Sequence, residues 1–312
     1  MNNAPHNPHD EGQGRTGSAG VGDKRLLPLT VWLCSDDTGP TTRRTTTTST
    51  ATSTSGRKPQ DQVCAQHRQA VGAQLARHLV ETCTRPGDLV VEAFTSSATT
   101  LVTAVQAGRD GAALVPHFPL AQHIGARIRA ELPEALRQRA GLRPVRPDQM
   151  ARGLADRLGE VALVVAAPPA YEVGGRVPKV AAGARGCPAC RADLWMLDGE
   201  QMHRFLFACW RVLKPGGVLA VITTARHRED GRLHDPAPRI IQHASGLGLR
   251  YVQHVIALRV PIDGDTLAVQ YAPGELAQLR DAASRALPPK VSVHADVCLF
   301  IKSASTGVGG AR

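Results

Sequence analysis

Short apolar segments that alternate with helical patterns are the feature of this sequence that most restricts its fold. These segments lack the polar alternation of half-exposed strands and are typical of strands buried on both faces of a sheet. They are Leu89–Val91, Ala112–Val115, Val161–Ala166 and Val218–Thr223. The helical patterns around them span Gln62–Thr82, Thr99–Ala107, Pro119–Leu132, Met202–Leu213 and Ile240–Leu247. Strands that alternate with helices predict a doubly wound α/β domain with a mostly parallel sheet.

The last part of the chain departs from this alternation. Leu249–Val260 and Val291–Ile301 both resemble strands. We expect these two strands to form a C-terminal antiparallel pair. Just before the strand that begins at Val218, the segment Lys214–Gly217 reads KPGG and predicts a turn that ends the preceding helix.

Composition divides the chain into one folded body and several flanking segments. The body is predicted to span 61–303, and the apolar run Leu26–Cys34 predicts a short strand within 25–37 that docks on it. Residues 1–24, the Thr/Ser-rich linker 38–60 and the tail 304–312 lack apolar periodicity and are predicted to be disordered. Residues 168–199, which are rich in proline and glycine, are predicted to form a lid loop over the end of the sheet.

The overall composition excludes some classes of protein. The chain has 312 residues, of which 42% are hydrophobic, and contains no apolar run of the roughly 18 to 20 residues that a membrane helix needs. We therefore expect no membrane partner. The N-terminus carries no export signal, and seven scattered cysteines do not form a disulfide framework. Both observations predict a cytoplasmic protein.

Positive charge is in excess. The net charge is +10, which favours polyanionic partners, although an ordinary solvated basic surface is an equally good interpretation. The candidate phosphate-binding segments are Arg226–Arg228 and the stretch from Arg43–Arg44 to Arg57–Lys58.

A loop of small residues, Glu92–Thr100, follows the first sheet strand and precedes a helix. In open α/β sheets, ligands bind at the carboxyl ends of strands, where helix N-termini point. The position predicts a small-ligand site. The loop nevertheless lacks the glycines of the dinucleotide fingerprint, so these residues alone leave cofactor binding and a ligand-free loop both open.

Three segments in this order resemble the amino-group DNA methyltransferases, which transfer a methyl group from S-adenosylmethionine to N4 of cytosine or N6 of adenine. Thr84–Val102 (TRPGDLVVEAFTSSATTLV) is similar to the family's T-x-P-G-D-L-V-L-D-P-F-x-G-x-G-T-T-L-V. Leu163–Tyr171 (LVVAAPPAY) resembles its D-L-V-V-T-S-P-P-Y, and Cys209–Gly217 (CWRVLKPGG) resembles a helix and turn shared by methyltransferases of this fold. The resemblance runs from about Val31 to Lys302 and implies a Rossmann-like methyltransferase fold.

The resemblance also implies site residues, and it has departures that fall on them. The implied catalytic residues are Pro168, whose carbonyl would accept a hydrogen bond from the target amine, Pro169, and Tyr171. The family's aromatic position falls on Ala170, so Tyr171, one residue later, would stack on a flipped base if the loop shifts register, and covering the sheet edge is an equally good interpretation of it. In the family's pattern both motif glycines, the motif aspartate and the side chain before the first proline differ from this chain, which has Ser96, Ala98, Glu92 and Ala167 there. The implied residues for binding S-adenosylmethionine are Glu92, Phe94, Thr95, Ser96, Ala98, Thr99, Thr100 and His117.

Cysteine and histidine spacing suggests a zinc module only superficially. Cys187 and Cys190 are followed by His203 and Cys209, but the last two are six residues apart on one predicted helix and therefore point about 120° apart. We expect unligated thiols and no metal site.

Three functions remain open from the sequence. The leading one is a methyltransferase acting on an exocyclic amine of a DNA base. The second is a catalytically degenerate member of the fold that serves as a nucleic-acid-binding or protein-interaction module, because the departures concentrate at cofactor and base contacts. The third is a methyltransferase for another substrate, RNA or a small molecule.

Overall fold

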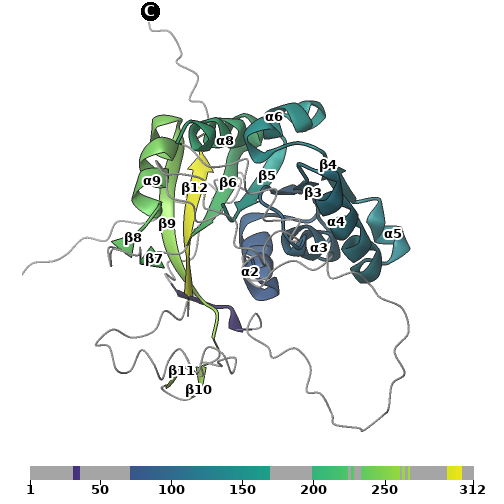
Figure 1. Ribbon diagram of the computed structural model, residues 1–312, viewed down its shortest axis with the longest axis horizontal. Helices are drawn as coiled ribbons and strands as arrows, with labels where there is room; N and C mark the ends of the chain where they lie inside the picture. Colours follow the sequence, from purple (N-terminus) through teal and green to yellow (C-terminus); the bar gives the residue numbers. More distant parts are fainter. Residues whose placement is uncertain are drawn as a thin grey trace, which may run out of the picture.

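The computed structural model describes residues 31–35, 71–168, 199–223, 226–227, 233–260, 262–263, 266–267 and 294–303. These residues form one eight-stranded sheet flanked by helices, together with two short two-stranded hairpins (Figure 1). The hairpins are β7 (Arg226–His227) with β8 (Leu233–His234) and β10 (Ile262–Asp263) with β11 (Thr266–Leu267).

The main sheet is parallel except for one strand. Its order is β1-β9-β12-β6-β5-β2-β3-β4. β12 pairs antiparallel with both β9 and β6, whereas every other adjacent pair is parallel. The strands are β1 (Val31–Leu33), β2 (Leu89–Glu92), β3 (Asp110–Leu114), β4 (Ala140–Arg143), β5 (Val161–Ala166), β6 (Leu213–Thr223), β9 (Leu249–Leu258) and β12 (His294–Lys302).

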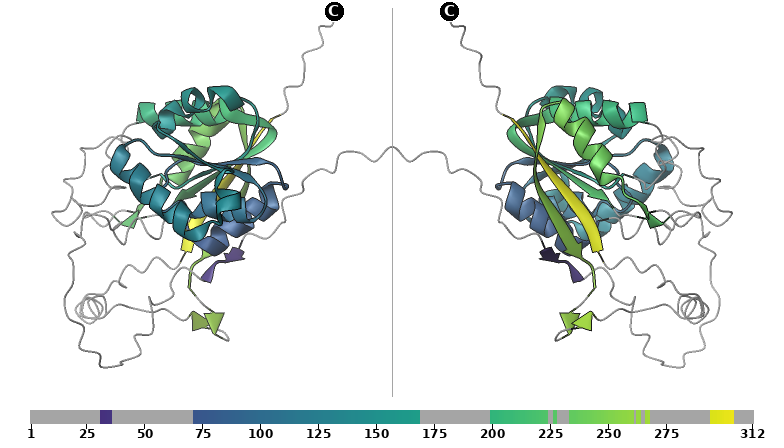
Figure 2. Two further views of the ribbon diagram at one scale, coloured as in Figure 1. Left: turned by 90° about the vertical axis from the view of Figure 1, so that its right-hand side faces the viewer. Right: turned by 90° about the vertical axis from the view of Figure 1, so that its left-hand side faces the viewer.

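Helices cover both faces of this sheet, as the two side views in Figure 2 show. They are α2 (Ala73–Cys83), α3 (Thr99–Gln106), α4 (Phe118–Glu131), α5 (Glu134–Arg137), α6 (Met150–Gly153), α8 (Gly199–Val212) and α9 (Ala237–Gly246), with 3₁₀ turns η3 (Pro147–Gln149) and η4 (Ala155–Arg157). Successive residues of a strand face opposite layers. Val91 accordingly packs in the cluster of α6, α8 and α9, whereas Val90 packs in the cluster of α2. This double burial explains why the central strands have no polar alternation.

The path of the chain creates a switch point in the sheet. β2, β3 and β4 advance toward one edge, and β5 then returns to the other side of β2. In doubly wound sheets the crevice at such a point, outside the carboxyl ends of the strands, is the ligand site. The predicted fold class, a Rossmann-like and mostly parallel sheet with a C-terminal antiparallel strand pair, is confirmed.

Several predicted boundaries differ from the structure. The described part of the first helix begins at Ala73, and residues 62–70 lie outside the described residues. α8 ends at Val212 as the KPGG segment predicts, but β6 begins already at Leu213, because Val161 of β5 pairs with Leu213 and Leu163 with Val218. Lys214–Gly217 therefore forms an insertion within the start of a strand. β4 and α5 were not predicted.

An ion pair joins two segments that lie 126 residues apart in the sequence. Lys214 of the KPGG segment pairs with Oδ1 of Asp88, which belongs to the TRPGD segment before β2. The other oxygen of Asp88 accepts a hydrogen bond from the amide of Arg85 at 2.8 Å. Both segments lie at the amino ends of the parallel strands, so these residues stabilise the fold at the edge opposite the carboxyl ends of the strands. Within the described residues, no helix is long and apolar enough to cross a membrane.

Arg109 is a buried arginine whose hydrogen bonds connect the turn before β2 to the segment between α3 and β3. Its Nε and Nη2 donate to Oγ1 and the carbonyl oxygen of Thr84, each at 3.0 Å, and its Nη1 donates to the carbonyl of Ala107. We expect Arg109→Met to lower the free energy of unfolding by about 2 kcal/mol, because two buried carbonyls lose a charged donor. Chemical denaturation measures this effect. Arg157→Met removes only an exposed ion pair to Glu160, should cost less than about 1 kcal/mol, and serves as the control. Equal losses in both variants would contradict the role given to Arg109.

Candidate functional site

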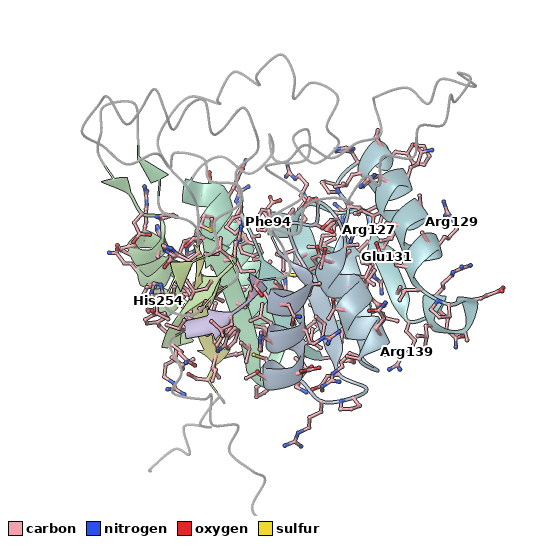
Figure 3. The ribbon with its side chains drawn as sticks, turned by 90° about the horizontal axis from the view of Figure 1, so that it is seen from below. Phe94, Arg127, Arg129, Glu131, Arg139 and His254 are labelled. Carbon is pink, nitrogen blue, oxygen red and sulfur yellow. The ribbon has the colours of Figure 1, made fainter. Side chains whose placement is uncertain are left out.

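The switch point of the sheet brings together two of the segments singled out in the sequence. Glu92, the last residue of β2, pairs with Val165 of β5, and the amide of Ala93 donates to the Val165 carbonyl at 2.9 Å. The small-residue loop after β2 and Pro168 after β5 therefore leave the sheet from adjacent strands. Figure 3 views the molecule from this edge, with Phe94 near the centre.

The side chain of Glu92 is buried and caps helix α3. Its Oε2 accepts a hydrogen bond from the amide of Leu101 at 2.9 Å, and only 4% of the residue is exposed. Burial raises the pKa of this carboxyl, while hydrogen bonds from Leu101, Thr95 and Thr100 and the charge of Arg127 act in the opposite direction. The carboxylate thus supplies the acceptors that the first amides of a helix lack.

The loop between Glu92 and α3 is held by its own hydroxyl groups. Oγ1 of Thr95 accepts from the amide of Ala98 at 3.0 Å, and the hydroxyls of Ser97 and Thr99 are hydrogen-bonded at 2.9 Å. Thr95, Ser96 and Ser97 are between 4% and 7% exposed. The loop is consequently a packed element rather than an open backbone cradle.

Ala98 has a backbone conformation that favours glycine. Its φ of 55° and ψ of 26° lie in the left-handed region, and it is the only non-glycine residue with positive φ in the described part of the chain. An L-residue in this region costs roughly 1 to 2 kcal/mol. The methyl group is fully buried. The turn before α3 therefore has a backbone conformation typical of glycine, and an alanine occupies it here.

The ring of Phe94 has a packing partner, whereas the hydroxyl of Thr100 has no hydrogen-bond partner among the described residues. The ring of Phe94 packs edge-on against Phe205 of α8, with 5.0 Å between centroids, and joins the core on that face. Thr100 is fully buried, and its Oγ1 has no hydrogen-bond partner among the described residues. Buried hydroxyls are nearly always paired, so a bound ligand is one partner that could supply the missing hydrogen bond of Thr100.

His117 caps helix α4 at the end of the next strand, β3. Its Nδ1 accepts a hydrogen bond from the amide of Leu120 at 3.3 Å. The following residue, Phe118, is 72% exposed and presents an aromatic surface at the same edge of the sheet. Capping was not foreseen for His117, although a histidine before Phe-Pro at a helix start is a readable signal.

The predicted catalytic segment is described only in part. Ala167 and Pro168 follow β5 and are half-buried. Pro169, Ala170 and Tyr171 lie outside the described residues, as do the rest of the predicted lid and Cys187 and Cys190.

The remaining residues of the superficial zinc pattern do not converge. Cys209 lies in the apolar core, where burial raises the pKa of its thiol well above the ordinary value, and His203 meets His243 edge-on with 6.3 Å between ring centroids. The described residues contain no group of three or more potential ligands that could hold a metal ion.

A polar cluster that the sequence analysis missed lies at the same edge of the sheet. Nε2 of His254 is 2.9 Å from Oδ1 of Asp296, and Nε2 of His294 is 3.9 Å from Oδ2 of the same carboxylate. The alternation of His294 and Asp296 on one strand was a readable signal for a shared face. His254 enters through strand pairing across 42 residues, which the sequence does not reveal.

Comparisons with known proteins give structural likenesses alone. No family model and no curated protein matches the chain. Among solved structures, TrmN from Thermus thermophilus is 16% identical with a TM-score of 0.43, and the match covers 75% of this chain and 49% of that one. The [4+2]-cyclase SpnF is 15% identical with a TM-score of 0.45, covering 76% and 83%. A Burkholderia thailandensis 1,6-didemethyltoxoflavin-N1-methyltransferase with bound S-adenosylhomocysteine is 10% identical with a TM-score of 0.42, covering 74% and 78%.

Proposed function

We propose that this protein is an S-adenosylmethionine-dependent methyltransferase that acts on an exocyclic amine of a DNA base. The observation that carries the proposal is the arrangement of strand ends at the switch point of the sheet. There the loop Glu92–Thr100 and Pro168, which belong to the two segments that resemble amino-group DNA methyltransferases, leave adjacent strands β2 and β5. Ligand binding at this point of a doubly wound sheet follows from the topology itself.

Residues on two neighbouring strand ends fit the proposed cofactor. The unpartnered hydroxyl of Thr100 suits a polar group, and the exposed ring of Phe118 beside His117 suits an apolar or planar one. When bound, S-adenosylmethionine would supply an electrophilic methyl group. The loop residues Glu92, Phe94, Thr95, Ser96, Ala98 and Thr99 are part of the same proposed site.

Pro168 is the proposed contact for the methyl acceptor. The backbone carbonyl of Pro168 can accept a hydrogen bond from an N–H of the target amine. Ala167 offers no side-chain acceptor, which leaves the carbonyl as the available one at this strand end. Pro169 and Tyr171 complete the proposed catalytic segment, with Tyr171 stacking on the base.

Charge supports a nucleic-acid partner, with DNA as our choice and RNA as the alternative. The net charge is +10, and the second half of α4 carries Arg127 and Arg129, both labelled in Figure 3. Arg127 is paired with Glu131 in an i,i+4 ion pair, whereas no carboxylate partner of Arg129 is found among the described residues. Excess arginine on a protein surface attracts phosphates.

Calorimetric titration with S-adenosylmethionine and S-adenosylhomocysteine tests the proposal. Micromolar binding, followed by transfer of radiolabelled methyl groups to DNA, would support it. DNA binding without cofactor binding would replace it with a non-catalytic nucleic-acid module. Cofactor binding with transfer to RNA or a small molecule instead of DNA would retain the enzyme and change its substrate.

The double variant Ser96→Gly with Ala98→Gly is expected to tighten S-adenosylmethionine binding by about tenfold, equivalent to 1.4 kcal/mol. The change removes a left-handed alanine and two side chains where the resembling family brings its backbone against the cofactor. Titration calorimetry of both proteins measures it. Ser55→Gly lies outside the loop and is the control. An unchanged dissociation constant in a protein that binds the cofactor would refute the assignment of this loop.

A further inference from the structure

The direction of the carbonyl groups along β5 indicates where an amine bound by Pro168 would lie. Carbonyls of successive strand residues point toward opposite neighbours of the strand. The Val165 carbonyl accepts from the amide of Ala93 on the β2 side, so the Ala166 carbonyl points to the β6 side. Ala167 continues the alternation, because it packs in the cluster of α2 whereas Ala166 packs in that of α8 and α9. One residue further, the Pro168 carbonyl is on the β6 side again, and an amine that it binds lies over the end of β6.

β6 ends at Thr223, which strand register places beside Pro168. Ala166 of β5 pairs with Val221 of β6, so Pro168 and Thr223 each follow two residues later on adjacent strands. Adjacent strands lie about 4.8 Å apart. The side chain of Thr223 projects to the same face as that of Val221, which packs in the cluster of α8 and α9. A carbonyl and a hydroxyl at this spacing can bind two neighbouring atoms of one planar ring.

The hydroxyl of Thr223 provides an independent sign of a missing ligand. Only 6% of this residue is exposed, and its Oγ1 has no hydrogen-bond partner among the described residues. Asp296 of β12 is its cross-strand neighbour, but Oδ1 of that carboxylate is 2.9 Å from Nε2 of His254. Buried hydroxyls in proteins are nearly always paired. A polar atom of the methyl acceptor would satisfy this one.

The target amine of either base has a ring nitrogen as its neighbour. The carbon that bears the amine of cytosine also carries N3, and the carbon that bears the amine of adenine also carries N1. Both ring nitrogens accept a hydrogen bond, and a threonine hydroxyl can donate one. The amine, a donor, therefore matches the carbonyl of Pro168, and the ring nitrogen, an acceptor, matches the hydroxyl of Thr223. Extruded bases are read in this way, by hydrogen bonds to their Watson–Crick edge.

We propose that the Thr223 hydroxyl donates a hydrogen bond to the ring nitrogen beside the target amine and so selects and orients the base; this inference rests on the proposed function. Two hydrogen bonds from adjacent strands, one at Pro168 and one at Thr223, fix the base in its own plane with the amine at the end of β5. In thymine a carbonyl oxygen stands in place of the amine and would face the carbonyl of Pro168. The pair of contacts therefore discriminates between bases as well as positioning the right one.

Thr223→Val is the variant that tests the hydroxyl, because valine keeps the shape of threonine and suits a strand. Since Oγ1 has no partner among the described residues, the free variant should unfold at the same urea concentration as the wild type or at a higher one. A lower midpoint would show that the protein itself binds the hydroxyl, which overturns the inference. Thr223→Ser keeps the hydroxyl. Thr103→Val removes the hydroxyl of a half-buried threonine of α3 and is the control.

The decisive measurement is single-turnover methyl transfer, at limiting DNA, to two kinds of mixed-sequence DNA. One is natural, and in the other the methylated base is replaced by its deaza analogue, 3-deazacytosine or 1-deazaadenine, which keeps the amine and has C–H in place of the ring nitrogen. On natural DNA we expect Thr223→Val to be about tenfold slower than the wild type, the effect of one lost hydrogen bond. On the deaza DNA the two proteins should react equally fast, because neither can form that bond. Thr223→Ser and Thr103→Val should follow the wild type on both, and all four proteins should bind S-adenosylmethionine equally.

The outcomes separate this inference from the proposed function. If the wild-type protein methylates DNA and Thr223→Val is slowed by the same factor on natural and deaza DNA, the hydroxyl does not contact the ring nitrogen and the inference fails alone. Wild-type rates for Thr223→Val on natural DNA overturn it in the same way. Weaker cofactor binding by Thr223→Val would assign the hydroxyl to the cofactor instead of the base, which also overturns the inference. If the wild-type protein fails to bind the cofactor or to methylate DNA, the proposed function fails and takes the inference with it.

Discussion

Replacing Gly217 by alanine is expected to lower the free energy of unfolding by about 3 kcal/mol, because the added methyl group has no room. A Cβ at this position would lie 2.8 Å from the carbonyl oxygen of Lys214 and 2.9 Å from that of Val161. Both are backbone atoms, so the conflict cannot be relieved by a rotamer change. It falls where β6 joins β5, and relief requires the two strands to move apart. Urea denaturation measures the loss.

The neighbouring glycine supplies a matched control. Gly216 has a φ of 72°, but a Cβ there would meet nothing within 4 Å. Gly216→Ala should therefore cost only the left-handed backbone term, about 1 kcal/mol. A similar small loss in Gly217→Ala would mean that the strands β5 and β6 are not packed as closely as the structure has them at this point.

The same pair of glycines shows why the fold was predictable from sequence. The KPGG segment breaks the helical pattern at Val212, and the apolar run Val218–Thr223 restarts immediately afterwards. A proline and two glycines between a helical pattern and a continuously apolar run leave few other assignments of secondary structure. The alternation of such units predicted the parallel sheet, and the structure confirmed it, together with the C-terminal antiparallel pair.

β4 illustrates what local pattern could not reveal. Its sequence, Ala140–Arg143, contains a single large apolar residue, and all four residues are only half-buried. It becomes a strand because it pairs with β3, with Gly111 opposite Ala140. That pairing is a tertiary effect, and tertiary context routinely overrides weak local preference.

The sequence predicted the position of the candidate site but not the hydrogen bonds among its residues. The sequence located the loop after β2 because a strand, small residues and a helix follow one another there. It could not show that Glu92 reaches the amide of Leu101, nine residues on, or that His254 meets Asp296 across two strands. Both contacts depend on three-dimensional register, which a pattern of residue types does not fix. The residues implied for the cofactor and for catalysis stay predictions until ligand binding is measured.

Glu92→Ala is the second change for which a large loss is expected, about 3 kcal/mol of the free energy of unfolding. Alanine removes the acceptor of the Leu101 amide and of the Thr100 amide and Thr95 hydroxyl, and these donors become buried without partners. The helix N-terminus also loses the negative charge that its dipole favours. Glu92→Gln keeps an acceptor oxygen at the same reach and should lie within about 1 kcal/mol of the wild type.

The dependence on pH distinguishes a capping carboxylate from a merely space-filling side chain. Because burial raises the pKa of Glu92 in the folded protein, the native state holds this proton more tightly than the unfolded chain does. The stability that comes from binding this proton is fully present below the ordinary pKa of 4.5. It is lost as the pH rises through the higher pKa of Glu92 in the folded protein. Glu92→Gln has no such proton, so its stability relative to the wild type should rise over the same interval and then level off. Denaturation curves of both proteins between pH 4 and 8 measure this difference. A constant difference across the range would mean that the carboxyl is solvated, and the buried cap of α3 would then have to be abandoned.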